Sequence, residues 1–186
     1  MTLPADEPEP DAALVERFRR GEREAFDRIV VRYRRDIYRV SYRMTGKHED
    51  ADDVTQETFL RAYRALASFR GDSALRTWLF RIALNLSINV GRARSARALQ
   101  ARDVDAAAVG GGSEDPESES RLLEDERASL VRRAVRSLPP RQRQVVILRM
   151  YEELQFNEIA SVLECPIGTA KANFFHAMNN LRKALA

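Results

Sequence analysis

The chain has 186 residues, 44% of them hydrophobic and 32% charged, and its formal net charge of +3 is a mild basic excess that selects no class of partner by itself. The single cysteine, Cys165, excludes an internal disulfide framework and a zinc site built only from cysteines. Apolar runs stay far below the roughly 20 residues that span a bilayer, and no signal-peptide pattern begins the chain, so we expect a cytoplasmic protein without membrane insertion.

The chain begins with an acidic segment, which is followed by apolar residues at helical spacing. Residues 1–11 carry three prolines and four acids, bury too little apolar surface to order themselves, and are predicted to form a disordered acidic tail. From Leu14 to Met44 apolar residues recur at three- and four-residue steps, interrupted at Gly21. This spacing is typical of helices with one buried stripe, and Gly46 is the predicted helix end.

A second apolar stripe covers residues 51–66, and the acids at its start suit the positive end of a helix dipole. Its outward face mixes polar groups with one exposed leucine, which is typical of a surface that binds a partner. The four residues of this face are Asp53, Gln56, Glu57 and Leu60.

A third helix is expected after the turn-like residues 68–73, with Asp72 or Ser73 as its N-cap. Its apolar stripe runs over residues 75–90, and we assign Trp78 to the core rather than to a stacking surface. The predicted helices between residues 12 and 97 form one bundle.

Residues 98–120 read as a linker. Between residues 103 and 120 the chain carries Gly110-Gly111-Gly112 and six acids but no base. If flexible, about 20 such residues have a root-mean-square span of roughly 25 Å. The expected fold class is therefore all-α, with two small helical domains joined by a flexible acidic, glycine-containing linker.

The C-terminal domain, residues 121–186, begins with a helical pattern that Pro139-Pro140 stops, and another helix follows. Residues 157–163 and 169–184 then form a predicted helix-turn-helix around a turn at residues 164–168. The inward side chains are expected to be Ile159, Ala160, Val162, Leu163, Ile167, Ala170, Phe174, Ala177, Leu181 and Leu185.

The outer face of the second of these helices has groups that suit a major groove. Lys171 can reach guanine or phosphate, Asn173 suits adenine, and Phe175 can touch a thymine methyl. A helical hairpin without a DNA role is the alternative for the same spacing. The full predicted face is Thr169, Lys171, Ala172, Asn173, Phe175 and His176.

Enzymatic and metal-binding alternatives find little support. His48, Glu49, Asp50, Asp52 and Asp53 are oxygen-rich enough to suggest a divalent metal site. On one helix, however, they fan around the axis, and the helix dipole already explains the acids. No nucleophile with a base and an orienting group can be assembled, and no glycine-rich phosphate loop is present, so we expect a non-enzymatic protein without metal or cofactor.

Five motifs in order give the chain a family resemblance. They are Asp-Val-Thr-Gln-Glu-Thr-Phe-Leu-Arg-Ala-Tyr at 53–63, Phe-Arg-Gly-Asp-Ser at 69–73, Thr-Trp-Leu-Phe-Arg-Ile-Ala at 77–83, Leu-Pro-Pro-Arg-Gln-Arg at 138–143 and Cys-Pro-Ile-Gly-Thr-Ala-Lys at 165–171. From about Ala12 to its end the chain resembles extracytoplasmic-function sigma factors, which are small bacterial factors of the sigma-70 family.

The resemblance implies an alternative sigma factor that binds core RNA polymerase and directs promoter-specific transcription, in a stress or envelope response. Residues 12–97 would bind polymerase through the face on 53–60 and would recognise and melt the minus-ten element, and residues 121–186 would read the minus-thirty-five element. The residues for minus-ten DNA would be Ser68, Phe69, Arg70, Gly71 and Asp72 in a base-capturing loop, and Arg81, Asn85, Asn89 and Arg92 on the next helix.

The family also implies an anti-sigma factor as a probable partner. One departure from its pattern concerns Asn173, His176 and Met178, where the family commonly has arginines. The second domain is therefore expected to bind weakly or to read an unusual upstream element. A free-standing helix-turn-helix regulator, which binds duplex DNA without polymerase, remains the alternative function.

Overall fold

A computed structural model of the protein describes residues 9–101 and 119–186. Within these ranges the secondary structure is helical and contains no β-strand, in agreement with the all-α prediction. None of the helices described there is long and apolar enough to cross a membrane. The N-terminal domain contains α1 (Asp11–Arg19), α2 (Arg23–Thr45), α3 (His48–Ala65), the 3-10 helix η1 (Leu66–Ser68) and α4 (Leu75–Ala101).

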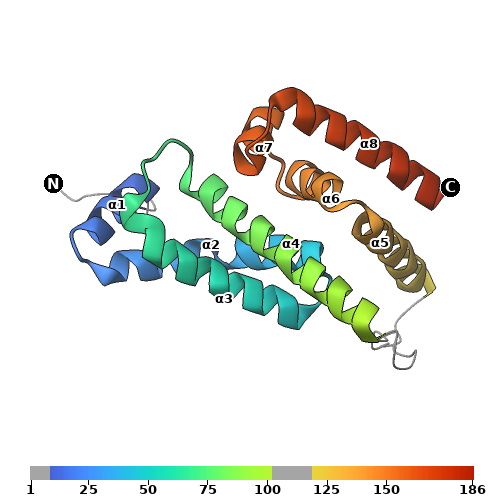
Figure 1. The fold of residues 1–186 in the computed structure, drawn as a ribbon, viewed down its shortest axis with the longest axis horizontal. Helices are drawn as coiled ribbons and strands as arrows, with labels where there is room; N and C mark the ends of the chain where they lie inside the picture. Colours follow the sequence, from blue (N-terminus) through green and yellow to red (C-terminus); the bar gives the residue numbers. More distant parts are fainter. Residues whose placement is uncertain (1–8, 102–118) are drawn as a thin grey trace.

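Helices α2, α3 and α4 pack against one another, and α1 covers one end of this bundle (Figure 1). The predicted stripes form its core, with Leu14, Ile29, Ile37 and Leu79 at 0–1% exposure. Gly46 ends α2 as predicted, with a φ of 74° in the left-handed region that glycine adopts without strain. Trp78 is half-buried against this core.

The structure corrects one helix start and extends two predicted boundaries. The N-cap prediction is wrong, because α4 begins at Leu75, and the carbonyl of Ala74 accepts its first hydrogen bond, from Trp78. Most of the predicted tail and linker lies outside the described residues. The predicted linker segment 98–120 nevertheless begins and ends in helix, because α4 continues to Ala101 and α5 begins at Glu119.

The last residues of the predicted tail are held by ion pairs. The carboxylate of Glu9 lies 3.0 Å from the guanidinium of Arg17, and Asp11 contacts Arg32. The neighbouring arginines lower the pKa of Glu9 against the opposing effect of burial, which is the larger single influence. Glu9 and Asp11 are therefore held in place although they precede the first apolar residue of the helical pattern, because ion pairs take the place of apolar contacts.

The C-terminal domain contains α5 (Glu119–Ser137), α6 (Pro140–Val146), the π-helical segment η2 (Ile147–Tyr151), α7 (Phe156–Leu163) and α8 (Ile167–Leu185). Pro139 and Pro140 separate α5 from α6 as expected, since Pro140 is the first residue of α6 and needs no N–H there. Gln155 and Glu158 form a capping box that starts α7.

The predicted helix-turn-helix is α7 and α8. Glu164, with a φ of 51°, ends α7 and starts the turn. Eight of the ten predicted inward residues are buried or half-buried, but Ile167 and Leu185 are 46% and 47% exposed, so the prediction is wrong for those two. They are the first and last residues of α8, where no neighbouring helix covers them.

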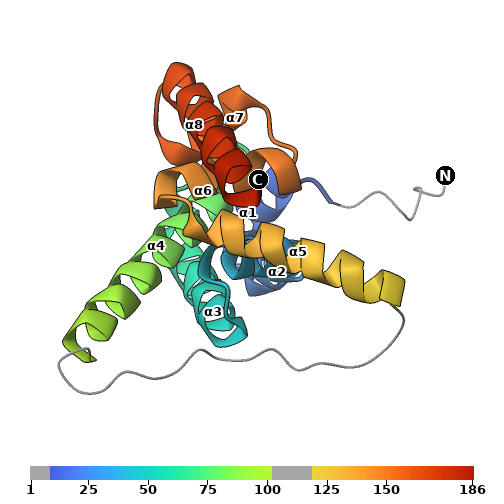
Figure 2. The ribbon, with the colours of Figure 1, turned by 90° about the vertical axis from the view of Figure 1, so that its right-hand side faces the viewer.

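The two domains lie against each other instead of apart. In Figure 1 the C-terminal domain packs along α2 and α4, and Figure 2 shows α5 crossing α2. One apolar cluster includes buried side chains of both domains, among them Phe80 of α4 and Ile147, Leu148 and Ile159 of the C-terminal domain. The sequence did not predict this contact.

Candidate functional site

The outward face of α3 is exposed as the sequence predicted. Asp53 and Gln56 are exposed, Leu60 is 45% exposed, and Glu57 is half-buried with a 2.7 Å ion pair to Arg61 one turn later. The opposite face of α3 supplies the core side chains Val54, Thr58, Phe59 and Ala62. The four predicted residues are thus brought together on one accessible strip of a firmly anchored helix.

A groove between α2 and α3 extends this strip, and the side of the groove formed by α2 was not predicted from the sequence. Val30 and Arg34 line it opposite Gln56 and Leu60. The neighbouring Val31 of α2 is 81% exposed, and an apolar side chain left this exposed is more informative than a polar one. An apolar residue that falls off the buried stripe, as Val31 does, was the available signal.

The loop between η1 and α4 is held in place from both sides. Phe69 packs on Trp78 with ring centroids 5.2 Å apart, and Arg19 of α1 donates hydrogen bonds to the carbonyls of Ala67 and Phe69. A hollow lies between this loop and α1, and Phe69, Arg70 and Gly71 line it together with residues of α1.

Gly71 in this loop has a φ of 80°, and a Cβ there would meet no atom within 4 Å. A side chain would therefore have room at this position, and it is the left-handed backbone conformation that favours glycine there. Ser68 and Asp72 are exposed, and the Ser68 hydroxyl donates to the carbonyl of Ala65 at 2.8 Å. Three of the five predicted loop residues, Phe69, Arg70 and Gly71, thus line one concave site, and Ser68 and Asp72 do not.

Three of the four residues predicted on the outer face of α4 are exposed, and the fourth, Arg81, is not. Asn85 and Asn89 are exposed and one helical turn apart, and Arg92 is also exposed further along. Arg81 is engaged with the C-terminal domain: one nitrogen lies 2.7 Å from the Glu164 carboxylate and another donates to the carbonyl of Ser161 at 2.7 Å.

The outer face of α8 is largely free of charge. Of its six predicted residues Lys171 is the one formal cation, and Phe175 is 64% exposed. Asn173 is half-buried and donates one amide hydrogen to the carbonyl of Thr169 at 3.0 Å, which leaves its side-chain oxygen and its second amide hydrogen for an outside partner. Met178, 40% exposed, lies one turn beyond and extends the apolar part of this face.

The structure gives His48 a packing role. Its imidazole stacks on Tyr42, with ring centroids 4.4 Å apart, and its Nδ1 hydrogen-bonds the hydroxyl of Tyr38 at 2.5 Å. Among the residues that the structure describes, no group of three or more histidine, cysteine and acidic side chains could hold a metal ion.

Comparisons with known proteins show the family of the chain. The family described as sigma-70 region 2 matches residues 29–98, and the family described as sigma-70, region 4 matches residues 128–181. The RNA polymerase sigma-H factor of Pseudomonas aeruginosa is 40% identical over 182 residues, which cover 95% of this chain and 94% of the relative. The ECF RNA polymerase sigma-E factor of Escherichia coli is 40% identical over 173 residues, 90% of each chain.

Solved structures show the same fold. CnrH, in complex with the cytosolic domain of CnrY, has a TM-score of 0.68 and 24% identity, over 95% of this chain and 97% of that one. The sigma factor RpoE of Bartonella quintana, in complex with the anti-sigma factor NepR, has a TM-score of 0.65 and 25% identity, over 86% and 96%.

Proposed function

The chain belongs to the extracytoplasmic-function (ECF) sigma factors of the sigma-70 family, and from this premise we propose which of its surfaces bind polymerase and which bind promoter DNA. It is an alternative sigma factor, which binds core RNA polymerase and directs transcription initiation at selected promoters without catalysis of its own. The proposal assigns polymerase binding and the minus-ten element to residues 12–97, and the minus-thirty-five element to residues 121–186.

Polymerase binding is assigned to the strip on α3, that is Asp53, Gln56, Glu57 and Leu60. The observation that carries this assignment is the exposure of Leu60 at the groove between α2 and α3, on a helix whose other face packs in the core. Exposed apolar side chains gain by burial against a partner, and the surrounding polar groups give the contact its orientation.

The minus-ten element is assigned to the loop Ser68, Phe69, Arg70, Gly71, Asp72 and to the face of α4 with Arg81, Asn85, Asn89 and Arg92. Melting a duplex opposes stacking of about 1.4 kcal/mol per base-pair step, so the protein must capture unpaired bases. The hollow beside Phe69 and Arg70 supports capture of a base, and the exposed amides of Asn85 and Asn89 suit base edges.

The minus-thirty-five element is assigned to α8, through Thr169, Lys171, Ala172, Asn173, Phe175 and His176. With one formal cation on this face, few phosphate contacts are available, and binding to duplex DNA by the free chain should be weak. This weakness favours a polymerase-bound sigma factor over a free-standing helix-turn-helix regulator.

An anti-sigma factor is the proposed regulator, since the related RpoE was solved in complex with NepR. We place the protein in the bacterial cytoplasm, where the polymerase acts, and in a stress or envelope response.

Transcription in vitro tests the proposal. The purified chain is mixed with sigma-free core polymerase and genomic fragments, and the transcripts are sequenced. We expect new transcripts that share upstream elements, and weaker association with core for Asp53→Ala with Gln56→Ala at an unchanged circular dichroism spectrum. Strong gel shifts of duplex promoter DNA by the chain alone, without transcripts, would support the free-standing regulator instead.

A further inference from the structure

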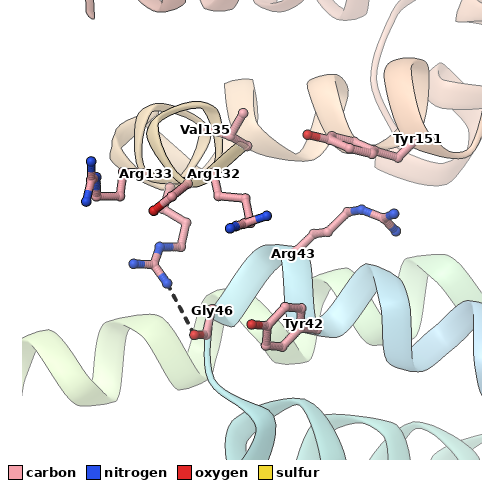
Figure 3. A pocket seen from close by; sticks show the side chains of 9 residues that line it. Tyr42, Arg43, Gly46, Arg132, Arg133, Val135 and Tyr151 are labelled. Carbon is pink, nitrogen blue, oxygen red and sulfur yellow. Dashed lines mark hydrogen bonds between the residues drawn. The ribbon is translucent and has the colours of Figure 1, made fainter. Parts of the chain in front are cut away.

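Four arginines line a pocket between α2 and α5, which we call the arginine pocket (Figure 3). Arg43 of α2 lies on one side of it. Three arginines of α5 lie on the other side, namely Arg132, Arg133 and Arg136. The cavity has a volume of about 160 Å³, and none of the described residues that line it is acidic. Four guanidiniums therefore surround a small cavity without a carboxylate.

The lack of a carboxylate is local to this pocket. The chain has 28 acidic residues, and at the neighbouring contact between the domains the Glu152 carboxylate lies 2.7 Å from Arg76. The side chains of Arg132 and Arg133, in contrast, have no hydrogen-bond or ion-pair partner among the residues that the structure describes. Since a guanidinium has five N–H donors, both side chains are available to an outside acceptor.

The other two guanidiniums have partners that leave donors free. Arg136 donates to the carbonyl of Gly46 at 3.2 Å, and a Cβ at Gly46 would lie 2.5 Å from its Nη1, so the glycine leaves room for this arginine. Arg43 lies 4.4 Å from the ring centroid of Tyr151 and 3.5 Å from the carboxylate of Glu152, which two further arginines also contact. Three positive charges on α5 therefore have no carboxylate at the pocket.

The uncompensated charge also affects the neighbouring Arg143, which donates a hydrogen bond to the carbonyl of Arg136. Burial lowers the pKa of the Arg143 guanidinium, and the positive charge of Arg136 lowers this pKa further. A cavity lined by charges of one sign concentrates ions of the opposite sign. An anion in the arginine pocket would therefore relieve repulsion between the guanidiniums that surround it.

The chemistry and size of the pocket suit linked phosphates. Guanidiniums bind phosphate oxygens through paired, charge-assisted hydrogen bonds. One phosphate group carries about −1.5 to −2 charges near pH 7, which is too few for three guanidiniums, whereas two or three linked phosphates carry enough. The cavity of about 160 Å³ is smaller than the roughly 300–1,000 Å³ of pockets for drug-sized ligands, so it favours a compact anion.

We propose that the arginine pocket binds a short phosphate chain, that is, a diphosphate or triphosphate group, either inorganic or at the end of a nucleotide. Arg132 and Arg136 bind the chain from α5, and Arg43 binds it from α2. Figure 3 shows the guanidinium of Arg132 pointing into the space between these helices, whereas Arg133 points outward at the rim. Neither polymerase nor promoter DNA takes part in this site.

Isothermal titration calorimetry of the full chain with sodium tripolyphosphate tests the site, at low salt and without divalent cations. We expect a dissociation constant of about 100 μM or lower. Orthophosphate should bind at least about tenfold more weakly, because it carries fewer charges. Equal affinities for the two anions, or no binding of tripolyphosphate at about 1 mM, would overturn the proposal.

Arg132→Gln tests the wall formed by α5. The substitution removes a guanidinium that has no partner among the described residues, so the fold should be unaffected and tripolyphosphate should bind about tenfold more weakly. Arg127→Gln is the matched control, because Arg127 is exposed on the same helix and is not among the residues that line the pocket. Equal losses of affinity for both variants would show attraction to net charge alone and would overturn the site.

Arg43→Gln tests the wall formed by α2. We expect tripolyphosphate to bind about tenfold more weakly at an unchanged circular dichroism spectrum. Unchanged affinity would show that α5 binds the anion by itself, and the site between the two helices would be refuted. Because the ligand contacts both domains, a saturating concentration of tripolyphosphate should also raise the melting temperature of wild type but not that of Arg132→Gln at the same concentration.

Further titrations identify the source of the phosphate chain. Equal affinities for ATP and tripolyphosphate would support an inorganic chain, and at least about fivefold tighter binding of ATP would support a nucleotide whose base adds contacts outside the cavity. A single-stranded oligonucleotide that binds more tightly than both, with a loss of affinity in Arg132→Gln, would overturn the small ligand in favour of a nucleic-acid backbone.

Discussion

Truncating two exposed apolar side chains, Leu60 of the polymerase-binding strip and Val31 of the neighbouring helix α2, should give a measurable loss of affinity for core polymerase without loss of fold. Val31 is 81% exposed and Leu60 45% exposed, so most of the first side chain and about half of the second are available for burial by a partner. Full burial of such side chains contributes about 1.5–3 kcal/mol each, and truncation to alanine keeps one carbon, so about 1 kcal/mol is at stake at each position. Val31→Ala with Leu60→Ala should therefore weaken core binding by about 2 kcal/mol, or roughly 30-fold.

The assay is fluorescence anisotropy of the full chain, labelled at its N-terminus and titrated with sigma-free core polymerase. Leu185→Ala is the matched control for Leu60→Ala, because Leu185 is 47% exposed at the far end of α8 and its truncation removes the same atoms as Leu60→Ala. An affinity of the double variant within twofold of wild type would show that polymerase does not bury this strip.

Three further outcomes follow from other surfaces. Asn85→Ala with Asn89→Ala should leave core binding within about twofold and reduce permanganate reactivity of the promoter bubble several-fold, since exposed amides are lost from the base-contacting face; a normal bubble would contradict the assignment. Phe175→Ala removes a side chain that is 64% exposed, and it should lower transcription about fivefold at promoters with thymine in the upstream element. An equal loss of transcription at promoters without that thymine would refute the contact. Glu152 is buried at the contact between the domains, beside Arg76 of α4, and burial raises the pKa of its carboxyl, so packing of the two domains against each other takes up a proton. This packing should be favoured as the pH falls and weakened as the pH rises through the raised pKa. The radius of gyration of wild type should thus be smaller at pH 5 than at pH 8, whereas that of Glu152→Gln should not change.

Helical periodicity predicted most of the fold because burial in this chain follows single stripes. The stripe positions Ile29 and Ile37 are 1% and 0% exposed, and Gly46 ends α2 where the pattern stops. The errors lie at helix ends. Ile167 and Leu185 have the spacing of the buried stripe of α8, yet the neighbouring helices do not extend far enough to cover them. The spacing of apolar residues in one helix does not show where the helices packed against it end.

The contact between the domains could not be predicted from local pattern. Arg76 and Glu152 are 76 residues apart, and Glu152 stands beside Glu153 as one of two consecutive glutamates with nothing to distinguish them. In the structure one is buried and the other exposed. Arg81 was predicted as a residue for minus-ten DNA, and the structure adds a competing partner for it in Glu164. Such competition depends on tertiary placement, which residue type and spacing do not encode.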